Sequence, residues 1–283
     1  MVRNHKSNAS IFSLFLCSLI FLSGTGDLWA QKTRSFSDGS IYTGELKKRK
    51  PYGIGRLTKA NGETYNGSFI DGVFHGKGTY TWFDGSYYTG SYVQGSREGL
   101  GQQFWPNGDH YTGSFIADEQ NGEGSYVWSD GSVYTGSFVQ GAITGYGEQR
   151  DPNGQIYIGQ FKDGQFHGEG QLTWPEGDLY IGHFNQGAID SFGYFDFAND
   201  FIYEGMLNEG QFHGIGELTM ANGDAYKGSF IHGEKSGFGR YTWNNGTVYV
   251  GHFENNLYHG EGSMTFPDGF KQEGLWESGE LLP

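Results

Sequence analysis

The sequence has almost no cysteine, because Cys17 is the only one among 283 residues. No small-residue lipobox precedes Cys17, so we expect neither a lipid anchor nor a disulfide framework. The chain also lacks a hydrophobic run that fits a membrane-spanning helix. Its most apolar stretch, residues 11–22, contains twelve residues, whereas a spanning helix needs about 20.

The first thirty residues differ in composition from everything that follows. Arg3 and Lys6 lie before the apolar stretch, and the segment ends at the small residue Ala30. This layout is typical of a secretory signal peptide. We therefore predict a cleavable signal peptide at residues 1–30 and export to the periplasm, the envelope or the extracellular space, with a retained signal anchor as the alternative.

Basic residues are scarce after residue 60. Residues 31–60 contain eight basic and two acidic residues, a net charge of +6, whereas residues 61–283 contain eight basic and 29 acidic residues, a net charge of −21. The acidic part repels nucleic acids and anionic lipids, so we expect no nucleic-acid partner. The candidate electrostatic contact is the basic run Lys47, Lys48, Arg49 and Lys50. Its expected partner is an anionic membrane or the acidic part of a second copy, and a solvated cationic end is the alternative.

Glycine and aromatic residues, in contrast, are abundant, with 50 glycines and 17% aromatic residues. A tyrosine recurs every 23 residues without insertion or deletion, at Tyr42, Tyr65, Tyr88, Tyr111, Tyr134, Tyr157, Tyr180, Tyr203, Tyr226 and Tyr249. The ten units cover residues 42–271, with a lead-in and partial repeat at residues 31–41 and a partial repeat or cap at residues 272–283. Such strict periodicity is typical of an array in which each unit stacks on its neighbours.

Each unit contains two segments that alternate as β-strands do. In the unit from Tyr65, "YNGSF" and "GKGTYTW" both place rings and glycines on one face. A pair such as Asp84–Gly85 follows the second segment and predicts a tight hairpin turn with left-handed backbone. Strand glycines leave notches that rings can cover. The predicted fold is all-β, an elongated, twisted, single-layer antiparallel β-meander of ten 23-residue hairpin repeats.

The pattern Tyr-x-Gly-x-Phe-x-x-Gly-x-x-His-Gly-x-Gly resembles the MORN (membrane occupation and recognition nexus) repeat. In one unit the matching residues are Tyr65, Gly67, Phe69, Gly72, His75, Gly76 and Gly78, and the resemblance extends from Tyr42 to about Gly279. It implies an elongated, groove-bearing β-sheet with roles in scaffolding, oligomer assembly or membrane attachment. It implies no catalytic activity.

Histidines recur at the eleventh position of the unit, at His75, His167, His213 and His259. With strands about 4.8 Å apart, histidines two units apart would lie about 20 Å from each other, too far to share one zinc ion. We expect them to make turn-stabilising hydrogen bonds instead. The sequence has no nucleophile elbow, zincin helix or phosphate-binding loop. We therefore predict no catalytic residue, no metal site and no cofactor.

The eighteenth position carries a candidate aromatic stripe formed by Trp82, Trp105, Trp128, Trp174 and Trp243. Rings at steps of about 10 Å suit stacking on a glycan or holding a hydrophobic peptide. The alternative is that these rings cover the glycines of neighbouring strands.

The unit from Tyr180 departs from the pattern, because Asp190–Ser191 replaces His-Gly and Asn199–Asp200 replaces the turn pair. It is also rich in phenylalanine. Sequence drift is one interpretation, and a local bend or contact surface is the other.

Together these features predict an exported, non-catalytic repeat scaffold that binds a protein partner or itself. The alternative function is a carbohydrate- or envelope-binding module that uses the tryptophan stripe.

Overall fold

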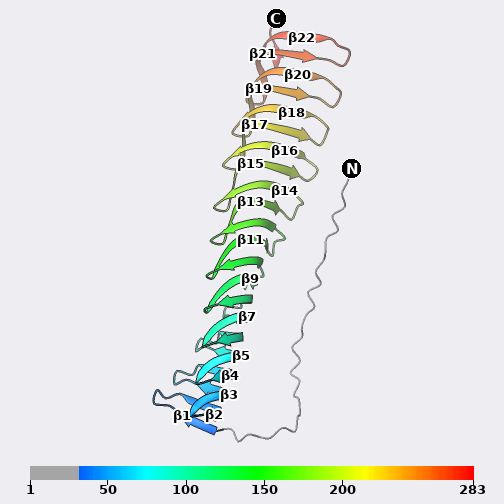
Figure 1. Ribbon diagram of the computed structural model, residues 1–283. Coiled ribbons are helices and arrows are strands. Elements are labelled where there is room, and N and C mark those ends of the chain that lie inside the picture. The colour runs from blue at the N-terminus through cyan, green and yellow to red at the C-terminus, as the bar shows by residue number, and fades with distance from the viewer. Residues whose placement is uncertain (1–31) are drawn as a thin grey trace, which may run out of the picture. The chain divides into compact units, whose positions relative to one another are not determined.

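The computed structural model describes residues 32–283, which form one long open antiparallel sheet of 23 strands. The expected signal peptide and Cys17 lie outside the described residues. Figure 1 shows the hairpins stacked one after another, with a progressive twist along the array. No helix that could span a bilayer occurs within residues 32–283. The predicted all-β meander of hairpin repeats is confirmed.

Each described strand pairs with the strands directly before and after it in the chain. The strands are β1 (Lys32–Ser35), β2 (Ile41–Lys47), β3 (Lys50–Thr58), β4 (Thr64–Ile70), β5 (Val73–Thr81), β6 (Tyr87–Val93), β7 (Ser96–Phe104), β8 (His110–Ile116), β9 (Glu119–Val127), β10 (Val133–Val139), β11 (Ala142–Arg150), β12 (Ile156–Lys162), β13 (Gln165–Thr173), β14 (Leu179–Asn185), β15 (Ala188–Phe197), β16 (Phe201–Asn208), β17 (Gln211–Met220), β18 (Ala225–Ile231), β19 (Glu234–Thr242), β20 (Val248–Glu254), β21 (Leu257–Thr265), β22 (Lys271–Glu277) and β23 (Glu280–Leu281).

The ten repeat tyrosines form the centre of the core, and their exposed fractions are 0% or 1%. The ring of Tyr65 lies across Gly67 on its own strand and Gly78 on β5. A Cβ atom would lie 2.6 Å from Tyr65 Oη at Gly67 and 2.3 Å at Gly78. Rings therefore cover the strand glycines, as predicted, and the covering ring is the repeat tyrosine and not the tryptophan of the eighteenth position.

A β-bulge interrupts each hairpin beside these glycines. Between β4 and β5, Gly67 pairs with Gly78 and Phe69 with Phe74, so Ser68 has no register partner on β5. The phenolic oxygen of Tyr65 donates a hydrogen bond of 3.0 Å to the carbonyl oxygen of Ser68. Equivalent bonds of 2.7–3.1 Å occur in all ten units. The tyrosine thus supplies a donor to a carbonyl at the bulge.

The turn inside each unit contains two left-handed residues. Asp71 and Gly72, between β4 and β5, have φ angles of +50° and +96°, as a two-residue type I′ turn requires. In the first unit the same turn is formed by Lys48 and Arg49, with φ angles of +48° and +64°. Two basic residues therefore occupy a turn that favours glycine at its second position.

The turn between units has one left-handed residue instead of two. Gly85 has a φ of +89°, but Asp84 is not left-handed. Backbone hydrogen bonds from the Trp82 amide to Ser86 and from the Gly85 amide to Trp82 close a loop of three residues. A loop of this length ends in one left-handed residue, so the predicted tight hairpin turn is present and its left-handed backbone is confined to Gly85.

The unit from Tyr180 keeps its hairpins despite its departures from the repeat. Ser191 takes a φ of +67° where other units have glycine, and Asn199 takes a φ of +68° in the following turn. Strands β15 and β16 still pair along their length. The substitutions therefore change the turn chemistry but leave the sheet continuous.

Candidate functional site

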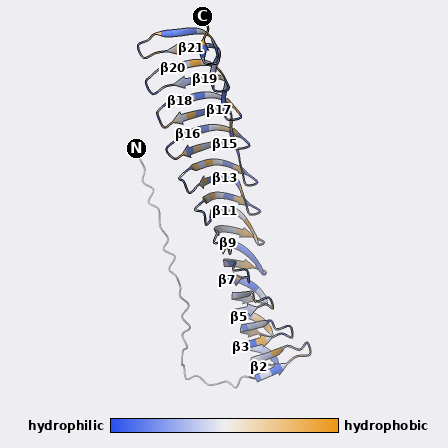
Figure 2. Cartoon of the chain, turned by 180° about the vertical axis from the view of Figure 1, so that it is seen from behind, coloured by the Kyte–Doolittle hydropathy of each residue, from blue (hydrophilic) through white to orange (hydrophobic). Residues whose placement is uncertain are grey.

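The buried tyrosines and phenylalanines of the first and fifth positions lie on one face of the sheet, which we call the aromatic face. The tenth, sixteenth and eighteenth positions also pack on this face, and most of them are half-buried. Hydrophobic residues recur from hairpin to hairpin along the array (Figure 2). The aromatic face therefore offers accessible ring surface over many units.

The tenth position is the variable part of the aromatic face. In three units a phenylalanine stacks on the repeat tyrosine with a centroid distance of 3.7–3.9 Å, namely Phe74 on Tyr65, Phe166 on Tyr157 and Phe212 on Tyr203. In two other units the tenth residue is a cation. Arg97 Cζ lies 5.6 Å from the ring centroid of Tyr88, and Lys235 Nζ lies 5.8 Å from that of Tyr226. At this range each cation is attracted by the ring beneath it.

Lys235 lies in an environment that disfavours the charged form of its amine. Burial lowers the pKa of Lys235, and the nearby Asp224 carboxylate opposes part of that shift. The Nζ atom also lies 5.1 Å from the ring centroid of Tyr241, whose hydroxyl donates a hydrogen bond of 2.9 Å to Asp224. The aromatic face thus holds an amine between two rings in this unit.

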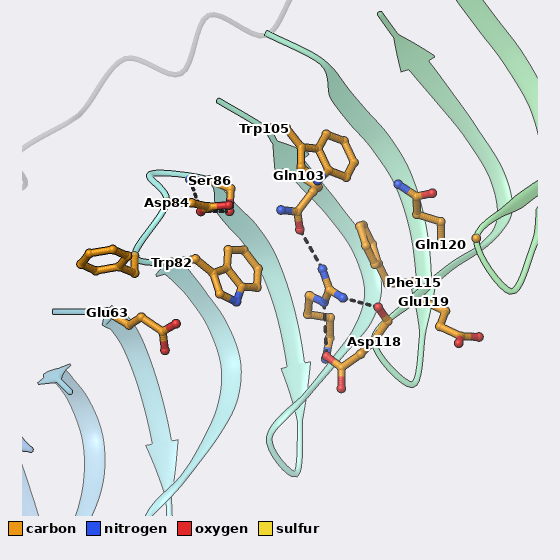
Figure 3. Close-up of a pocket in the computed structure, with 13 residues that line it drawn as sticks. Glu63, Trp82, Asp84, Ser86, Gln103, Trp105, Phe115, Asp118, Glu119 and Gln120 are labelled. Atoms are coloured by element: carbon orange, nitrogen blue, oxygen red, sulfur yellow. Dashed lines mark hydrogen bonds and ion pairs between the residues drawn. The ribbon is translucent and has the colours of Figure 1, made fainter. Parts of the chain in front are cut away.

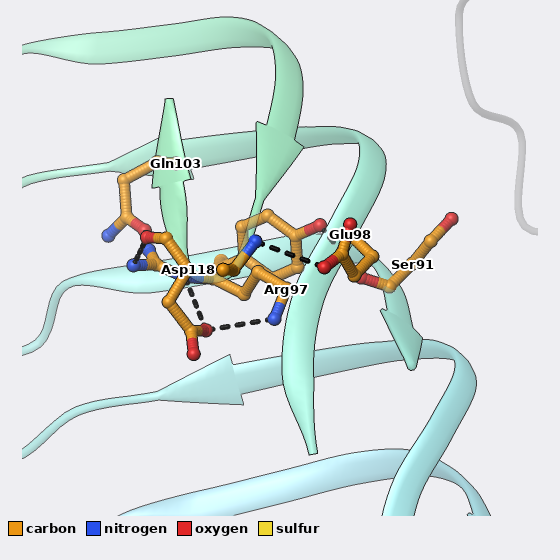
Figure 4. Close-up of polar contacts among 7 residues, drawn as sticks. Ser91, Arg97, Glu98, Gln103 and Asp118 are labelled. Carbon is orange, nitrogen blue, oxygen red and sulfur yellow. Dashed lines mark hydrogen bonds and ion pairs between the residues drawn. The ribbon is translucent and has the colours of Figure 1, made fainter. Parts of the chain in front are cut away.

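Arg97 is fixed by hydrogen bonds from two directions (Figure 4). Its Nη1 donates to Oε1 of Gln103 at 2.7 Å, and its Nε donates to Oδ1 of Asp118 at 3.2 Å. The backbone amide of Arg97 donates to the same carboxylate oxygen at 2.8 Å, and its Nη2 donates to the Asp118 carbonyl. Asp118 lies in a turn with Ala117, whose amide donates to Oε1 of Glu98 at 3.0 Å. The guanidinium is therefore held in one orientation on the aromatic face.

A pocket of about 660 Å³ lies beside Arg97 (Figure 3). Its aromatic lining residues are Trp82, Phe83, Trp105 and Phe115, and its carboxylates are those of Glu63, Asp84, Asp118 and Glu119. Arg97 is the basic residue in this lining, and it is already paired with Asp118. The pocket therefore combines ring surface with an excess of negative charge.

A second pocket, of about 570 Å³, is lined by Trp174, Ile189, Phe195, Phe197 and Phe212, with Glu176, Asp178 and His232 among its polar residues. Trp174 occupies the same repeat position as Trp82, four units later. Both pockets are built from the tenth, sixteenth and eighteenth positions of adjacent units. The two pockets therefore lie at equivalent positions of the repeat on the aromatic face.

The structure brings part of the predicted tryptophan stripe into these pockets. Trp82 and Trp105 line the first and Trp174 lines the second, whereas Trp128 and Trp243 line neither. Three of the tryptophans also pack on a tyrosine two residues earlier, with centroid distances of 4.7–4.8 Å, in the pairs Tyr80–Trp82, Tyr126–Trp128 and Tyr241–Trp243. These rings thus present only part of their surface to solvent.

The basic run Lys47–Lys50 lies on the turn between β2 and β3, with all four residues exposed. Lys47 Nζ lies 4.5 Å from the ring centroid of Tyr52. The run therefore extends from the side of the first complete hairpin and not from the end strand β1. Its role as an electrostatic contact stays a prediction.

Three of the four histidines of the eleventh position do not make the expected hydrogen bond through Nδ1. This atom is buried in His75, His167 and His213 and has no hydrogen-bond partner among the described residues. The prediction is therefore wrong for this ring nitrogen. Within residues 32–283, no group of three or more histidine, cysteine, aspartate or glutamate side chains is placed to hold a metal ion.

Arg97, Gln103, Asp118 and Lys235 were not among the residues predicted from the sequence to form a site. The tenth position is not part of the glycine and tyrosine pattern, so the pattern predicts no role for it. A signal was present, because two units have a cation where three others have phenylalanine. Only the structure shows that this cation lies on the aromatic face.

Three solved structures have low similarity to this chain. The SAS-4 TCP domain of Drosophila melanogaster, in complex with a proline-rich motif of Ana2, is 13% identical, and the match covers 82% of this chain and 97% of that chain with a TM-score of 0.22. Virginiamycin B lyase from Staphylococcus aureus is 12% identical, covering 86% and 87%, with a TM-score of 0.15. A streptogramin B lyase is 11% identical, covering 89% and 90%, with a TM-score of 0.15. No curated protein matches the sequence.

The repeats themselves give a specific match. The family model described as MORN repeat matches nine consecutive segments, residues 65–87, 88–110, 111–133, 134–156, 157–179, 180–200, 203–225, 226–248 and 249–271. The hairpin from Tyr42 precedes the first matched segment and has the same ring over Gly44 and Gly55. The matched segments cover most of the chain and follow its hairpins in phase. This chain therefore belongs to the MORN repeat family.

Proposed function

We propose that this chain is an exported, non-catalytic scaffold whose aromatic face binds an extended, basic segment of a protein partner. MORN repeats generally mediate protein or membrane interactions, and the family is generally not enzymatic. The observation that carries the proposal is the pair of pockets at equivalent repeat positions, both lined by rings and carboxylates. Rings bury apolar side chains of a partner, and the carboxylates attract its cations.

The distance between the pockets sets the length of the partner segment. Trp82 and Trp174 are four units apart, or roughly 40 Å at about 10 Å for each two-strand unit. An extended chain advances about 3.3 Å per residue. A segment that reaches both pockets therefore needs about 12 residues.

The charge of the pockets favours a protein segment over a neutral glycan. The first pocket has four carboxylates around its rings, and most neutral sugars gain little from a net negative charge. In addition, Trp82 and Trp128 pack against neighbouring tyrosines, which reduces the ring area available for sugar stacking. Glycan binding through the stripe remains the alternative function, and the same variants test it.

A library of random twelve-residue peptides tests the proposal. We expect the selected peptides to be enriched in lysine, arginine and apolar residues, and to bind at least about tenfold more weakly to Trp82→Ala/Trp105→Ala. Leu100→Ala is the matched control, because Leu100 is 68% exposed and lines neither pocket. Selection without basic residues, or equal binding to both variants, contradicts the proposal. Glycan-array binding that the tryptophan variant loses supports the alternative.

Export has a separate test. Protein isolated from the native host should begin at or near Gln31, as cleavage after Ala30 requires. Soluble protein that still begins at Met1 contradicts this part of the proposal.

A further inference from the structure

The face of the sheet opposite the aromatic face also carries large side chains. On β16 the buried side chains of Tyr203 and Leu207 lie on the aromatic face. Glu204 and Met206 alternate with them and are exposed on the other side of the sheet, which we call the opposite face. The second, fourth, thirteenth and fifteenth positions of the unit lie on this face. Neither pocket is lined by residues at these positions, so the proposed function leaves the opposite face unused.

An apolar row crosses the opposite face between β15 and β19. The thirteenth position is apolar in three consecutive units only here, at Phe192, Ile215 and Phe238. Met206, at the fourth position, is the register partner of Phe192 on the neighbouring strand. These four side chains are 52–59% exposed. Single exposed apolar residues are ordinary, whereas a group of them on neighbouring strands is typical of an interaction site.

A charged row lies beside the apolar row, two residues along the same strands, and its four residues are exposed. Glu204 and Glu217 are register partners on β16 and β17. Lys227 and Arg240 are register partners on β18 and β19. Like charges directly opposite each other on adjacent strands are destabilising. The row therefore contains two unfavourable pairs side by side, one acidic and one basic.

The chain itself neutralises this row only in part. Lys227 Nζ lies 2.9 Å from Glu217 Oε2, but both side chains are more than half exposed, and such a surface ion pair contributes little stability. Within residues 32–283, Glu204 and Arg240 have no ion-pair partner. The outer acid and the outer base of the row are thus available to another molecule.

The charged row is complementary to itself under a two-fold rotation. An axis that runs along the strands, between β17 and β18, would place β17 of one copy over β18 of the other and β16 over β19. Glu217 would then face Lys227 of the second copy. Glu204 would face Arg240 of the second copy. Every acid of the row would therefore meet a base, and every base an acid.

The same rotation also matches the apolar row. Met206 would lie against Phe238 of the second copy. Phe192 would lie against His252 of the second copy, whose imidazole already packs at 77° on Phe238 with a centroid distance of 5.6 Å. One axis therefore gives apolar contacts in one row and opposite charges in the other.

The twist of the sheet sets the extent of such a contact. Two sheets packed face to face lie about 10 Å apart, with strand directions within about 30° of each other. Since this sheet twists along the array (Figure 1), two copies would diverge away from the axis. We therefore expect contact over β15–β20 and not along the whole array.

We infer that two copies of this chain form an antiparallel dimer, in which the opposite faces of β15–β20 pack on each other across a two-fold axis. Charge complementarity favours a second copy as the occupant, because one rotation pairs all four charges of the row. The contact is isologous and closes as a dimer. This dimer goes beyond the proposed function, since neither pocket takes part in it and both aromatic faces stay open to partners.

Sedimentation equilibrium of the full chain tests the dimer and its alignment. We expect a monomer–dimer equilibrium in the parent, and association at least about tenfold weaker in Glu204→Lys, which sets two bases against each other. Glu204→Lys/Arg240→Glu exchanges the charges of one matched pair. This double variant should recover association to within about threefold of the parent.

The matched control is Glu204→Lys/Lys227→Glu, which has the same net charge. It exchanges charges between different pairs, so like charges meet in both of them and association should stay weak. Thermal unfolding confirms that each variant is folded. Equal association of the two double variants, or a parent chain that stays monomeric at high concentration, overturns the inference.

The apolar row has its own test. Phe238→Ser should weaken association by at least about tenfold, as for a residue at the centre of an interface. Leu100→Ser is the control, because Leu100 also occupies a thirteenth position and is 68% exposed, but lies outside β15–β20. It should associate like the parent, and equal losses in the two variants contradict the proposed contact. A monomeric parent whose binding to phosphatidylcholine vesicles is lost in Phe238→Ser would assign the row to a lipid surface and overturn the inference.

Discussion

The phenolic oxygen of Tyr65 lies 3.0 Å from the carbonyl oxygen of Ser68, three residues later on the same strand. The ring reaches this carbonyl by crossing Gly67, and the same ring covers Gly78 on the next strand. One side chain therefore fills the space above two strand glycines and donates a hydrogen bond at the bulge. The spacing of Tyr, Gly and the bulge in the repeat follows from this single contact.

Removing one phenolic hydroxyl should destabilise the array. Tyr65→Phe keeps the ring but leaves the Ser68 carbonyl without this donor, which should cost about 1–3 kcal/mol of unfolding free energy. The control is Tyr146→Phe, since Tyr146 is 64% exposed, and its effect should stay within about 0.5 kcal/mol. Urea unfolding curves measure both changes. Equal midpoints for the two variants would show that the hydroxyl contributes nothing.

A methyl group at the notch should also destabilise the array. In Gly78→Ala the new Cβ meets Oη and Cζ of Tyr65 at 2.3 and 2.4 Å, so the buried ring must move. Overpacking of this kind costs about 1–3 kcal/mol. If the ring is the cause, the double variant with Tyr65→Ala should lose less stability than the sum of the two single variants. Additive losses would contradict this explanation.

Restoring glycine in the aberrant unit should stabilise it. Ser191 has a φ of +67°, a conformation that costs a residue with a Cβ about 1–2 kcal/mol. We expect Ser191→Gly to raise the free energy of unfolding by up to about 1 kcal/mol, after part of the gain is lost to the greater freedom of glycine in the unfolded chain. Ser191→Ala is the matched control and should give no gain. Thermal unfolding distinguishes the two, and a loss of stability in Ser191→Gly would refute the strain argument.

The array should lose stability in alkali. Burial raises the pKa of the repeat tyrosines above the ordinary value of 10.0, and the pKa reaches about 12 in Tyr65, Tyr111 and Tyr226. A folded-state pKa above the unfolded value gives stability that is complete below pH 10 and is lost as the pH rises from about 10 to 12. Urea midpoints measured at rising pH should therefore fall through this window, together with a cooperative rise in phenolate absorbance. Gradual ionisation at pH 10 without loss of strand signal would contradict the burial of these hydroxyls.

The basic turn should control contact with anionic membranes. Replacing Lys47, Lys48, Arg49 and Lys50 with glutamine removes four exposed charges, each contributing about 1 kcal/mol near an anionic surface. Binding of the parent to anionic vesicles should weaken steeply above 0.1 M salt, where the screening length falls below about 10 Å. A control with Lys77, Arg150, Lys162 and Lys271 changed to glutamine should bind like the parent. If the first variant matches the parent at low salt, the turn is only a solvated cationic end.

Periodicity was sufficient to predict the sheet, its hairpins and the pairing of rings with glycines, because those features repeat in every unit. The turn types were harder to predict from the sequence. Asp71–Gly72 and Asp84–Gly85 are the same dipeptide, yet only the first has two left-handed residues. The length of the loop determines which turn type forms. Loop length depends on the register of the flanking strands, and the dipeptide alone does not specify that register.

The candidate site was predicted only in part, because it depends on what differs between units. The tryptophans were predicted from their repeat position. Which of them line a pocket also depends on the side chains of Arg97, Gln103 and Ile189, whose residue types are not part of the repeat pattern. Periodicity does not predict residues that differ from unit to unit. Their effect appears only when adjacent strands bring them together.

Pairing between consecutive strands gives the array a particular folding behaviour. Since every described strand forms its backbone pairing only with its sequence neighbours, these contacts are short in sequence and closing them costs little loop entropy. Folding can begin at any hairpin and spread in both directions, as in other linear repeat proteins. A weak unit in the interior, such as the one containing Ser191, then acts as a boundary at which the two flanking segments can unfold separately.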